Sequence, residues 1–131
     1  MARALVDSSG TPVTVEIEIG APVSAYVVRI SDGVAVGRAE FIDSPDGDVA
    51  ERIFFHTEVD PAFGGRGLAG VLMQVALEDS IREGRGIVPV CPLFARHLSR
   101  HGTEFVATGG RFRSPERADV FAVGRAVRER G

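Results

Sequence analysis

The sequence contains no lysine, because all fifteen of its Lys and Arg residues are arginines. This absence excludes the phosphate-binding lysine of a P-loop and every mechanism that forms a lysine Schiff base. An excess of positive charge is also lacking, since the formal net charge is -3 and the isoelectric point is about 5.6. A protein that binds a nucleic-acid backbone needs a basic surface, so we expect no nucleic-acid partner.

Cysteine and long hydrophobic runs are scarce as well. Cys91 is the only cysteine, which excludes an intramolecular disulfide and a cluster of thiolate ligands. With one thiol and three scattered histidines, the sequence predicts no metal site. No apolar run is long enough to span a bilayer, and Asp7 interrupts the amino terminus before the apolar segment of a signal peptide develops. We therefore expect a cytoplasmic protein that does not contact a membrane.

The composition that is present is typical of one folded domain. Hydrophobic residues make up 44% of the 131 residues and charged residues 25%, far from the composition of a disordered chain. A chain of this length forms a single domain around one buried core. We expect that domain to span residues 1–131, with a core at about residues 12–108 and a less regular tail at residues 109–131.

The first half of the chain has the pattern of an antiparallel meander. Residues 13–19 alternate apolar and polar side chains, as a strand with one buried face does. Asp32-Gly33 is a strong hairpin signal between two further apolar runs, and residues 44–48 form another turn. We expect strands at residues 13–19, 24–30, 34–42 and 49–59.

The second half changes to alternating helices and strands. Apolar residues at Leu68, Val71, Leu72 and Val75 have helical spacing, and Gly84 is a suitable residue to end that helix. A short buried strand at residues 86–90 follows, and Pro92 opens a second helix that extends to about Arg100. The whole pattern predicts an α+β fold with a mixed, largely antiparallel sheet flanked by two or three helices.

The last thirty residues have weaker signals. Residues 104–107 fit an edge strand. Ser114 fits the N-cap of a third helix, with Pro115 at its first position. We expect that helix to present Val120, Val123 and Val127 on one face.

A glycine-rich loop precedes the first helix. Gly65-Arg66-Gly67-Leu68-Ala69-Gly70 matches G-x-G-x-x-G, the fingerprint of a dinucleotide-binding fold. That fold also needs an acidic residue at the end of the next strand, where this chain has Val90-Cys91, and it needs further βαβ units after the loop. The alternatives are a different kind of pyrophosphate cradle, in which backbone N–H groups at a helix start bind an anion, and a plain surface turn.

Three motifs in order resemble the GNAT acetyltransferases (GCN5-related N-acetyltransferases), and in particular their small YjdJ-like subfamily. The motifs are His56-Thr57-Glu58-Val59, Gly65-Arg66-Gly67-Leu68-Ala69 and Val88-Pro89-Val90-Cys91-Pro92. Within the family's acetyl-CoA loop pattern, Gln/Arg-x-x-Gly-x-Gly/Ala, this chain matches at Arg66, Gly67 and Ala69. It departs at Gly64, where the family has glutamine or arginine. The resemblance covers roughly residues 24–101.

The resemblance implies a GNAT-like fold and acetyl-CoA as the cofactor. In the family, the strand before the loop splays from its neighbour and the pantetheine arm inserts there as an additional strand. By resemblance, Thr57, Glu58 and Val59 would offer backbone groups to the arm. The diphosphate would bind at Gly64, Gly65, Arg66, Gly67, Leu68, Ala69 and Gly70.

Three side chains are candidates for the chemistry. Transfer to an amine needs a base, and His56 is the first candidate because imidazole titrates near neutral pH. Strand alternation predicts that His56 shares a face with Phe54 and Glu58, which makes Glu58 the rival base. Cys91 precedes a helix start and is either a transiently acylated nucleophile, a proton donor to the leaving thiol, or a space-filling residue.

The sequence therefore predicts an N-acetyltransferase that acts on a small-molecule or peptide amine by direct transfer with general-base help. The alternative function is a non-catalytic acyl-CoA-binding or sensing module. The acceptor and the acyl chain length stay open, and so does the oligomeric state, monomer or homodimer.

Overall fold

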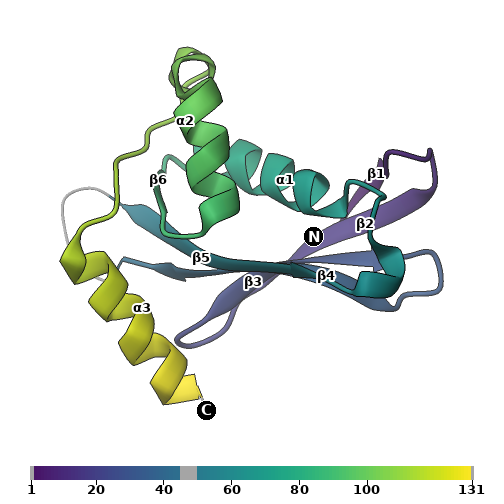
Figure 1. Ribbon diagram of the computed structural model, residues 1–131, viewed down its shortest axis with the longest axis horizontal. Helices are drawn as coiled ribbons and strands as arrows, with labels where there is room; N and C mark the ends of the chain where they lie inside the picture. The colour runs from purple at the N-terminus through teal and green to yellow at the C-terminus, as the bar shows by residue number, and fades with distance from the viewer. Residues whose placement is uncertain (1, 45–49, 131) are drawn as a thin grey trace.

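The computed structural model describes residues 2–44 and 50–130, so most of the turn expected at residues 44–48 and the first residue of the next strand lie outside the described residues. Six strands form one sheet whose spatial order follows the chain (Figure 1). The strands are β1 (Arg3–Val6), β2 (Pro12–Glu18), β3 (Ser24–Ile30), β4 (Ala35–Asp43), β5 (Glu51–Val59) and β6 (Gly86–Pro89). Neighbours are antiparallel except β5 and β6, which are parallel. The predicted mixed, largely antiparallel sheet is confirmed.

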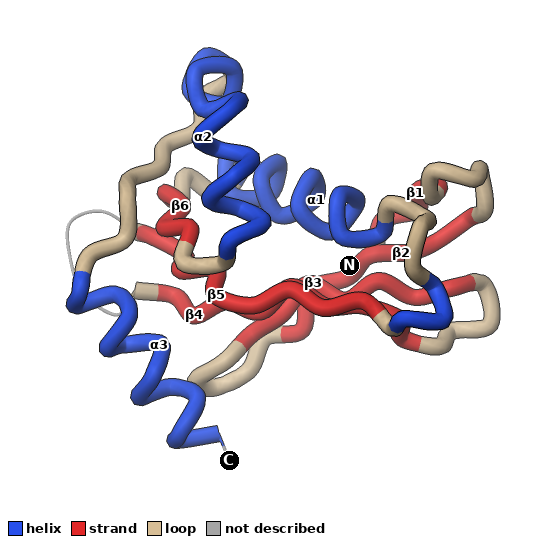
Figure 2. The backbone as a smooth tube through the Cα atoms, viewed as in Figure 1, coloured by secondary structure: helices blue, strands red, loops and turns tan. Residues whose placement is uncertain are grey.

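The described residues also form three α-helices and one 3-10 helix. They are η1 (Pro61–Phe63), α1 (Leu68–Arg82), α2 (Pro92–Ala107) and α3 (Arg117–Arg130). Helices α1 and α2 lie on one face of the sheet and α3 lies on the other, as Figure 2 shows. Within the described ranges, no helix is both long and apolar enough to cross a membrane.

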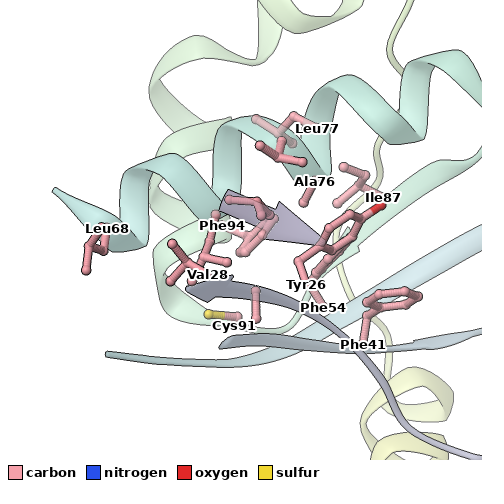
Figure 3. Close-up of a cluster of buried hydrophobic side chains, with 14 of the residues drawn as sticks. Tyr26, Val28, Phe41, Phe54, Leu68, Ala76, Leu77, Ile87, Cys91 and Phe94 are labelled. Carbon is pink, nitrogen blue, oxygen red and sulfur yellow. The ribbon is translucent and has the colours of Figure 1, made fainter. Parts of the chain in front are cut away.

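The main core lies between the sheet and helices α1 and α2. Tyr26, Phe41 and Phe54 project from three adjacent strands, and Phe94 from α2 stacks on Phe54 with ring centroids 4.4 Å apart (Figure 3). All four rings are at most 1% exposed. A smaller cluster on the opposite face joins α3 to Ile42, Ile53 and Val88. The two clusters show that both faces of β5 are covered near its start.

Glycines set both ends of α1, as the sequence predicts. Gly67 caps the start with φ 70°, and Gly84 follows the end with φ 67°. A residue with a side chain is strained in this left-handed region, so glycine is suited to both positions. The predicted hairpin at Asp32-Gly33 is also present, since the N–H of Gly33 donates to the carbonyl of Ile30 at 2.8 Å.

One expectation for the chain ends is wrong, and one strand was not predicted. Residues 104–107 are not an edge strand but the last turn of α2, which continues past a kink at His101 because Phe105 packs into the main core. Strand β1 was not expected, and it extends the sheet beyond the predicted start of the core by pairing Arg3–Val6 with residues 12–15 of β2.

Helix α3 begins later than expected and packs on the sheet mainly through small residues. It starts at Arg117 rather than at Pro115, because the Asp119 carboxylate accepts a hydrogen bond from the Glu116 N–H at 2.7 Å and fixes the first turn there. Ala126 is buried against the sheet, whereas Val120 and Val127 are 54% and 38% exposed. Ala126, Ala122 and Val123 pack against the sheet, and the other two valines of the expected helix face are exposed to solvent.

The contacts of Asp119 predict how the stability of the fold depends on pH in the acidic range. Arg113 donates two hydrogen bonds to its carboxylate, at 2.8 Å each, and also binds Glu51 at the start of β5. The bonds from Arg113, more than its charge, hold the pKa of Asp119 below its usual value. Because the pKa of Asp119 is lower in the folded than in the unfolded protein, its ionised carboxylate stabilises the fold above about pH 3.9, the unfolded value. This stabilisation is lost as the pH falls through the lower pKa of the folded protein. We expect Asp119→Asn to cost about 1 kcal/mol at neutral pH and to flatten this acid dependence.

The measurement is urea unfolding from pH 7 to pH 2.5, with Glu129→Gln as the matched control. Glu129 sits on the same helix in an exposed pair 4.0 Å from Arg125. An Asp119→Asn protein with wild-type stability at neutral pH would show that the Arg113 contacts do not hold the helix.

Candidate functional site

The glycine loop forms a bare backbone turn at the start of α1. Gly65 and Gly67 both have positive φ values, of 79° and 70°. Among the described residues, none accepts a hydrogen bond from the backbone N–H groups of residues 65–70, whereas the N–H of Val71 donates to the Gly67 carbonyl at 3.1 Å. Free N–H groups at the positive end of a helix attract anions.

Side chains do not fill the space in front of this loop. A Cβ atom built on Gly65 or Gly70 would meet no atom within 4 Å, and one on Gly67 would lie 3.4 Å from the Ser8 Cβ. The segment after β1 holds the loop in place, since the Ser8 N–H donates a hydrogen bond to the Arg66 carbonyl at 2.9 Å. The Arg66 guanidinium lies over the Phe63 ring at 5.0 Å. The loop is therefore held in place while its outer side stays open to an anionic ligand.

Strand β5 has an open edge close to the loop. Strand β6 pairs with β5 only from Glu51 to Phe54, and the Cys91 N–H then closes the contact by donating to the Phe54 carbonyl at 2.8 Å. Beyond Phe54, no strand of the described residues lies along that edge of β5. The two strands thus separate at the point where β5 runs on toward the glycine loop.

Two residues direct their backbone groups to this open edge. The Asp60 N–H donates to the Val36 carbonyl of the β4 side at 2.8 Å. Because successive residues of a strand point their N–H and C=O groups to alternate edges, Glu58 also faces β4, and Thr57 and Val59 face the open edge. The edge therefore offers donors and acceptors for an extended ligand at Thr57 and Val59, but not at Glu58.

Cys91 lies inside the gap between β5 and β6. It is the N-cap residue of α2, it is 4% exposed, and its Sγ lies 3.5 Å from the Thr57 Oγ1. Figure 3 shows the sulfur on the core side of the sheet together with Phe54 and Phe94. Cys91 is thus part of the main core and at the same time borders the open edge of β5.

A β-bulge places His56 on the opposite face. Phe41 pairs with Phe54 but the next residue, Glu40, pairs with His56, so Phe55 has no partner on β4. The extra residue shifts the alternation by one. The expectation that His56 shares a face with Phe54 is therefore wrong, because Phe54 is buried under α2 while the His56 side chain is 51% exposed on the α3 side.

Glu58 does share the face of His56, as expected. Its Oε2 lies 3.4 Å from the His56 Nε2, and its side chain is 61% exposed. The structure thus brings His56 and Glu58 together on one face of β5, and Thr57 and Cys91 together on the other. The open backbone edge lies between these two pairs, so a reactive group bound at the edge is reachable from both faces.

A charged group beside His56 was not found from the sequence. Glu40 pairs with His56 across the strands, is 6% exposed, and binds Arg130 of α3 at 2.6 Å. Alternation along β4 puts Arg38 and Glu40 on one face, but it does not say that His56 is opposite Glu40. That pairing depends on the bulge at Phe55, and no residue type around Phe55 is typical of a bulge.

The family model for GCN5-related N-acetyl-transferase matches residues 25–107. The match covers more than half of the chain and runs from β3 to the end of α2. The chain therefore belongs to the GCN5-related N-acetyltransferase family, and the resemblance seen in the three motifs is confirmed at the level of the family. Its place in the YjdJ-like subfamily stays a prediction.

The chain is also similar to two solved structures at low identity. A ribosomal-protein-alanine N-acetyltransferase from Brucella melitensis biovar Abortus 2308 is 20% identical, with a TM-score of 0.45, over 73% of this chain and 52% of its own. An acetyltransferase from Trypanosoma brucei is 22% identical, with a TM-score of 0.49, over 74% of this chain and 66% of its own. The chain thus spans between half and two thirds of these proteins. A comparison with curated protein sequences gives no match.

The dinucleotide interpretation of the glycine loop does not fit the structure. A dinucleotide-binding fold requires a doubly wound parallel sheet, with the loop at the point where the strand order reverses. Here the strand order follows the chain without reversal, and the only parallel pair is β5 with β6 among the described strands. The loop belongs to a different sheet topology.

Proposed function

We propose that this protein is an acetyl-CoA-dependent N-acetyltransferase that acts on a small-molecule or peptide amine. Membership of the family supports acyl transfer as the reaction. The observation that carries the proposal is the presence of two open backbone features that follow each other along the chain, the free edge of β5 at Thr57 and Val59 and the N–H groups of residues 65–70. Together they suit a long ligand with an anionic centre and an amide-bearing arm.

The residues fit coenzyme A in two places. Backbone N–H groups from Gly65 to Gly70 would bind the diphosphate, and the half-buried Arg66 guanidinium would add a charge-assisted bond to a phosphate oxygen. The amides of the pantetheine arm would pair with Thr57 and Val59 in the manner of an added strand. Gly64 contributes less, since its own N–H already donates to the Pro61 carbonyl at 3.2 Å.

Acetyl-CoA supplies an activated acetyl group as a thioester. The amine nitrogen attacks the carbonyl carbon, the new C–N bond replaces the C–S bond, and coenzyme A leaves as the thiol. His56 takes the proton that the amine loses, and Glu58, at 3.4 Å, orients the imidazole or serves as base in its place. The backbone holds the two reactants in position, which removes much of the entropic cost of their encounter.

Cys91 offers a less direct route. An acyl-Cys91 intermediate would need the thiol to attack the thioester from the core side, where its Sγ already contacts Thr57. Direct transfer is favoured because the sulfur is packed in the core with 4% of the residue exposed. In the direct route, the thiol is suited to donate a proton to the leaving coenzyme A.

Two measurements on the wild-type chain test this function. We expect isothermal titration to detect binding of acetyl-CoA and free coenzyme A but not NAD, because the loop lacks a dinucleotide-binding sheet. We expect a panel of amines to include acceptors that turn over acetyl-CoA. Binding of coenzyme A without turnover on any amine would instead indicate an acyl-CoA-binding or sensing module. NAD binding in preference to coenzyme A would overturn the cradle assignment.

The same preparation separates the two chemical routes. Intact-mass spectrometry after mixing with acetyl-CoA, without an acceptor, should show no acetyl adduct on the protein. An adduct that disappears in Cys91→Ser would establish the covalent route.

A further inference from the structure

The sheet face that carries His56 also holds a buried charged network that reaches into α3. Glu40 is the central residue, and its Oε2 lies 2.6 Å from Arg130 and 3.3 Å from Arg38. The Glu40 side chain is 7% exposed, whereas the side chains of Arg38 and Arg130 are 39% and 38% exposed. A carboxylate withdrawn from water in this way needs charged partners, and here it has two.

The network lies directly beside His56. Glu40 and His56 are partners in the register of β4 and β5, and side chains opposite each other on one sheet face are in contact distance. The bulge at Phe55 produces this pairing. The charged groups on this part of the face are Arg38 and Glu40 from β4, Glu58 from β5, and Arg130 from α3.

Helix α3 lies outside the part of the chain that the family model matches. The family model ends at residue 107, whereas α3 spans Arg117–Arg130. The helix is fixed at its start by Arg113, which bridges Glu51 and Asp119, and along its length by Ala126 in the second core cluster. Figure 1 shows it crossing below the sheet on the side away from α1 and α2. Its last turn is thereby held against the face that carries His56.

We infer that α3 is part of the acceptor side of the site, and that its Arg130, through Glu40, sets the charge around His56. The catalytic consequence rests on the proposed function, in which His56 is the base. Glu40 is a positioning residue in this scheme because it acts on the imidazole and not on the substrate. Its carboxylate lies on the strand opposite the imidazole, and Arg130 binds that carboxylate.

The two partners predict opposite effects on His56. Glu40→Gln leaves Arg38 and Arg130 without their carboxylate, which disfavours the imidazolium and lowers the titration midpoint of His56. Arg130→Ala leaves Glu40 less compensated, which favours the imidazolium and raises the midpoint. For partly exposed groups at this spacing we expect shifts of about half a pH unit in each direction.

Proton NMR titration of the three histidines in the full chain measures these shifts. His97 and His101 lie on α2, on the other face of the sheet, and serve as internal controls in the same spectra. Arg125→Ala is the matched control variant, because Arg125 is on the same helix but pairs with Glu129. If Glu40→Gln does not fold, Arg130→Ala alone still decides the question, since Arg130 is at the chain's exposed end.

The titration and the turnover assay fail in distinguishable ways. A His56 midpoint that stays at its wild-type value in Arg130→Ala overturns the inference, whatever the enzyme activity. Shifted midpoints accompanied by matching shifts in the acidic limb of kcat/KM support both the network and the base assignment. If the His56 midpoint shifts but the pH profile of kcat/KM does not change, the network is supported and the assignment of His56 as the base is contradicted.

Discussion

Gly67→Val should reduce the affinity for coenzyme A at least about 100-fold, a loss of about 2.7 kcal/mol. Gly67 caps α1 with φ 70°, a backbone conformation that a β-branched residue adopts only with strain. The new side chain would also meet Ser8, whose Cβ lies 3.4 Å from the position of the added atom. The loop must then shift, and the N–H groups of residues 65–70 would lose the arrangement that we propose for binding the diphosphate.

Gly84→Val is the matched control for that substitution. Gly84 follows the other end of the same helix with φ 67°, and a Cβ there meets no atom within 4 Å. Both variants should lose about 1–2 kcal/mol of stability from backbone strain. Only Gly67→Val should lose coenzyme A binding, measured by isothermal titration on protein whose fold is verified by circular dichroism. Equal affinities in the two variants would contradict a diphosphate cradle at this loop.

The parts of the fold that the sequence predicts are those with local causes. Gly67 and Gly84 mark the ends of α1 because their positive φ values suit glycine, and Asp32-Gly33 marks a hairpin for the same reason. The order of strands and helices from residue 24 to residue 101 follows from such signals. The glycine loop was found in this way, and its backbone is as open as the motif predicts.

The parts that the sequence does not predict depend on contacts between distant residues. Strand β5 has a bulge at Phe55, which has no partner on β4, and that single extra residue moves His56 to the face opposite Phe54. Phe105 keeps the end of α2 helical by packing into the main core. Arg113 joins residues 51 and 119, which sets where α3 lies. Each of these contacts spans a sequence separation that periodicity does not reach.

Because His56 lies on the face of the sheet opposite Phe54, its side chain is suited to a different chemical role from the one a pairing with Cys91 would give. On the α3 side, His56 is next to Glu58 and opposite Glu40, while Cys91 is across the strand in the main core. A histidine in this position is not paired with the thiol as a base activating a nucleophile would be. It is instead suited to take a proton from an acceptor amine that approaches from the α3 side.

His56→Ala should therefore lower kcat/KM for the amine about 100-fold to 10,000-fold at neutral pH, the range typical of a lost general base. The affinity for acetyl-CoA should change little, because in the proposed function Thr57 and Val59 would bind the cofactor through their backbone groups, and the substitution leaves the glycine loop untouched. The remaining activity should lose the acidic limb that a histidine base produces. Steady-state kinetics from pH 5.5 to pH 9, with the binding constant measured separately, resolves these effects.

Glu58→Gln and His101→Ala complete that experiment. Glu58 is 3.4 Å from the His56 ring, so its amide variant should cost only a modest part of the rate if it orients the imidazole. His101 is 49% exposed on α2, and its replacement should leave the rate at the wild-type value. A large loss in Glu58→Gln together with full activity in His56→Ala would move the role of base to the carboxylate. Since both side chains share one face of β5, the amine would still approach from the α3 side in that case.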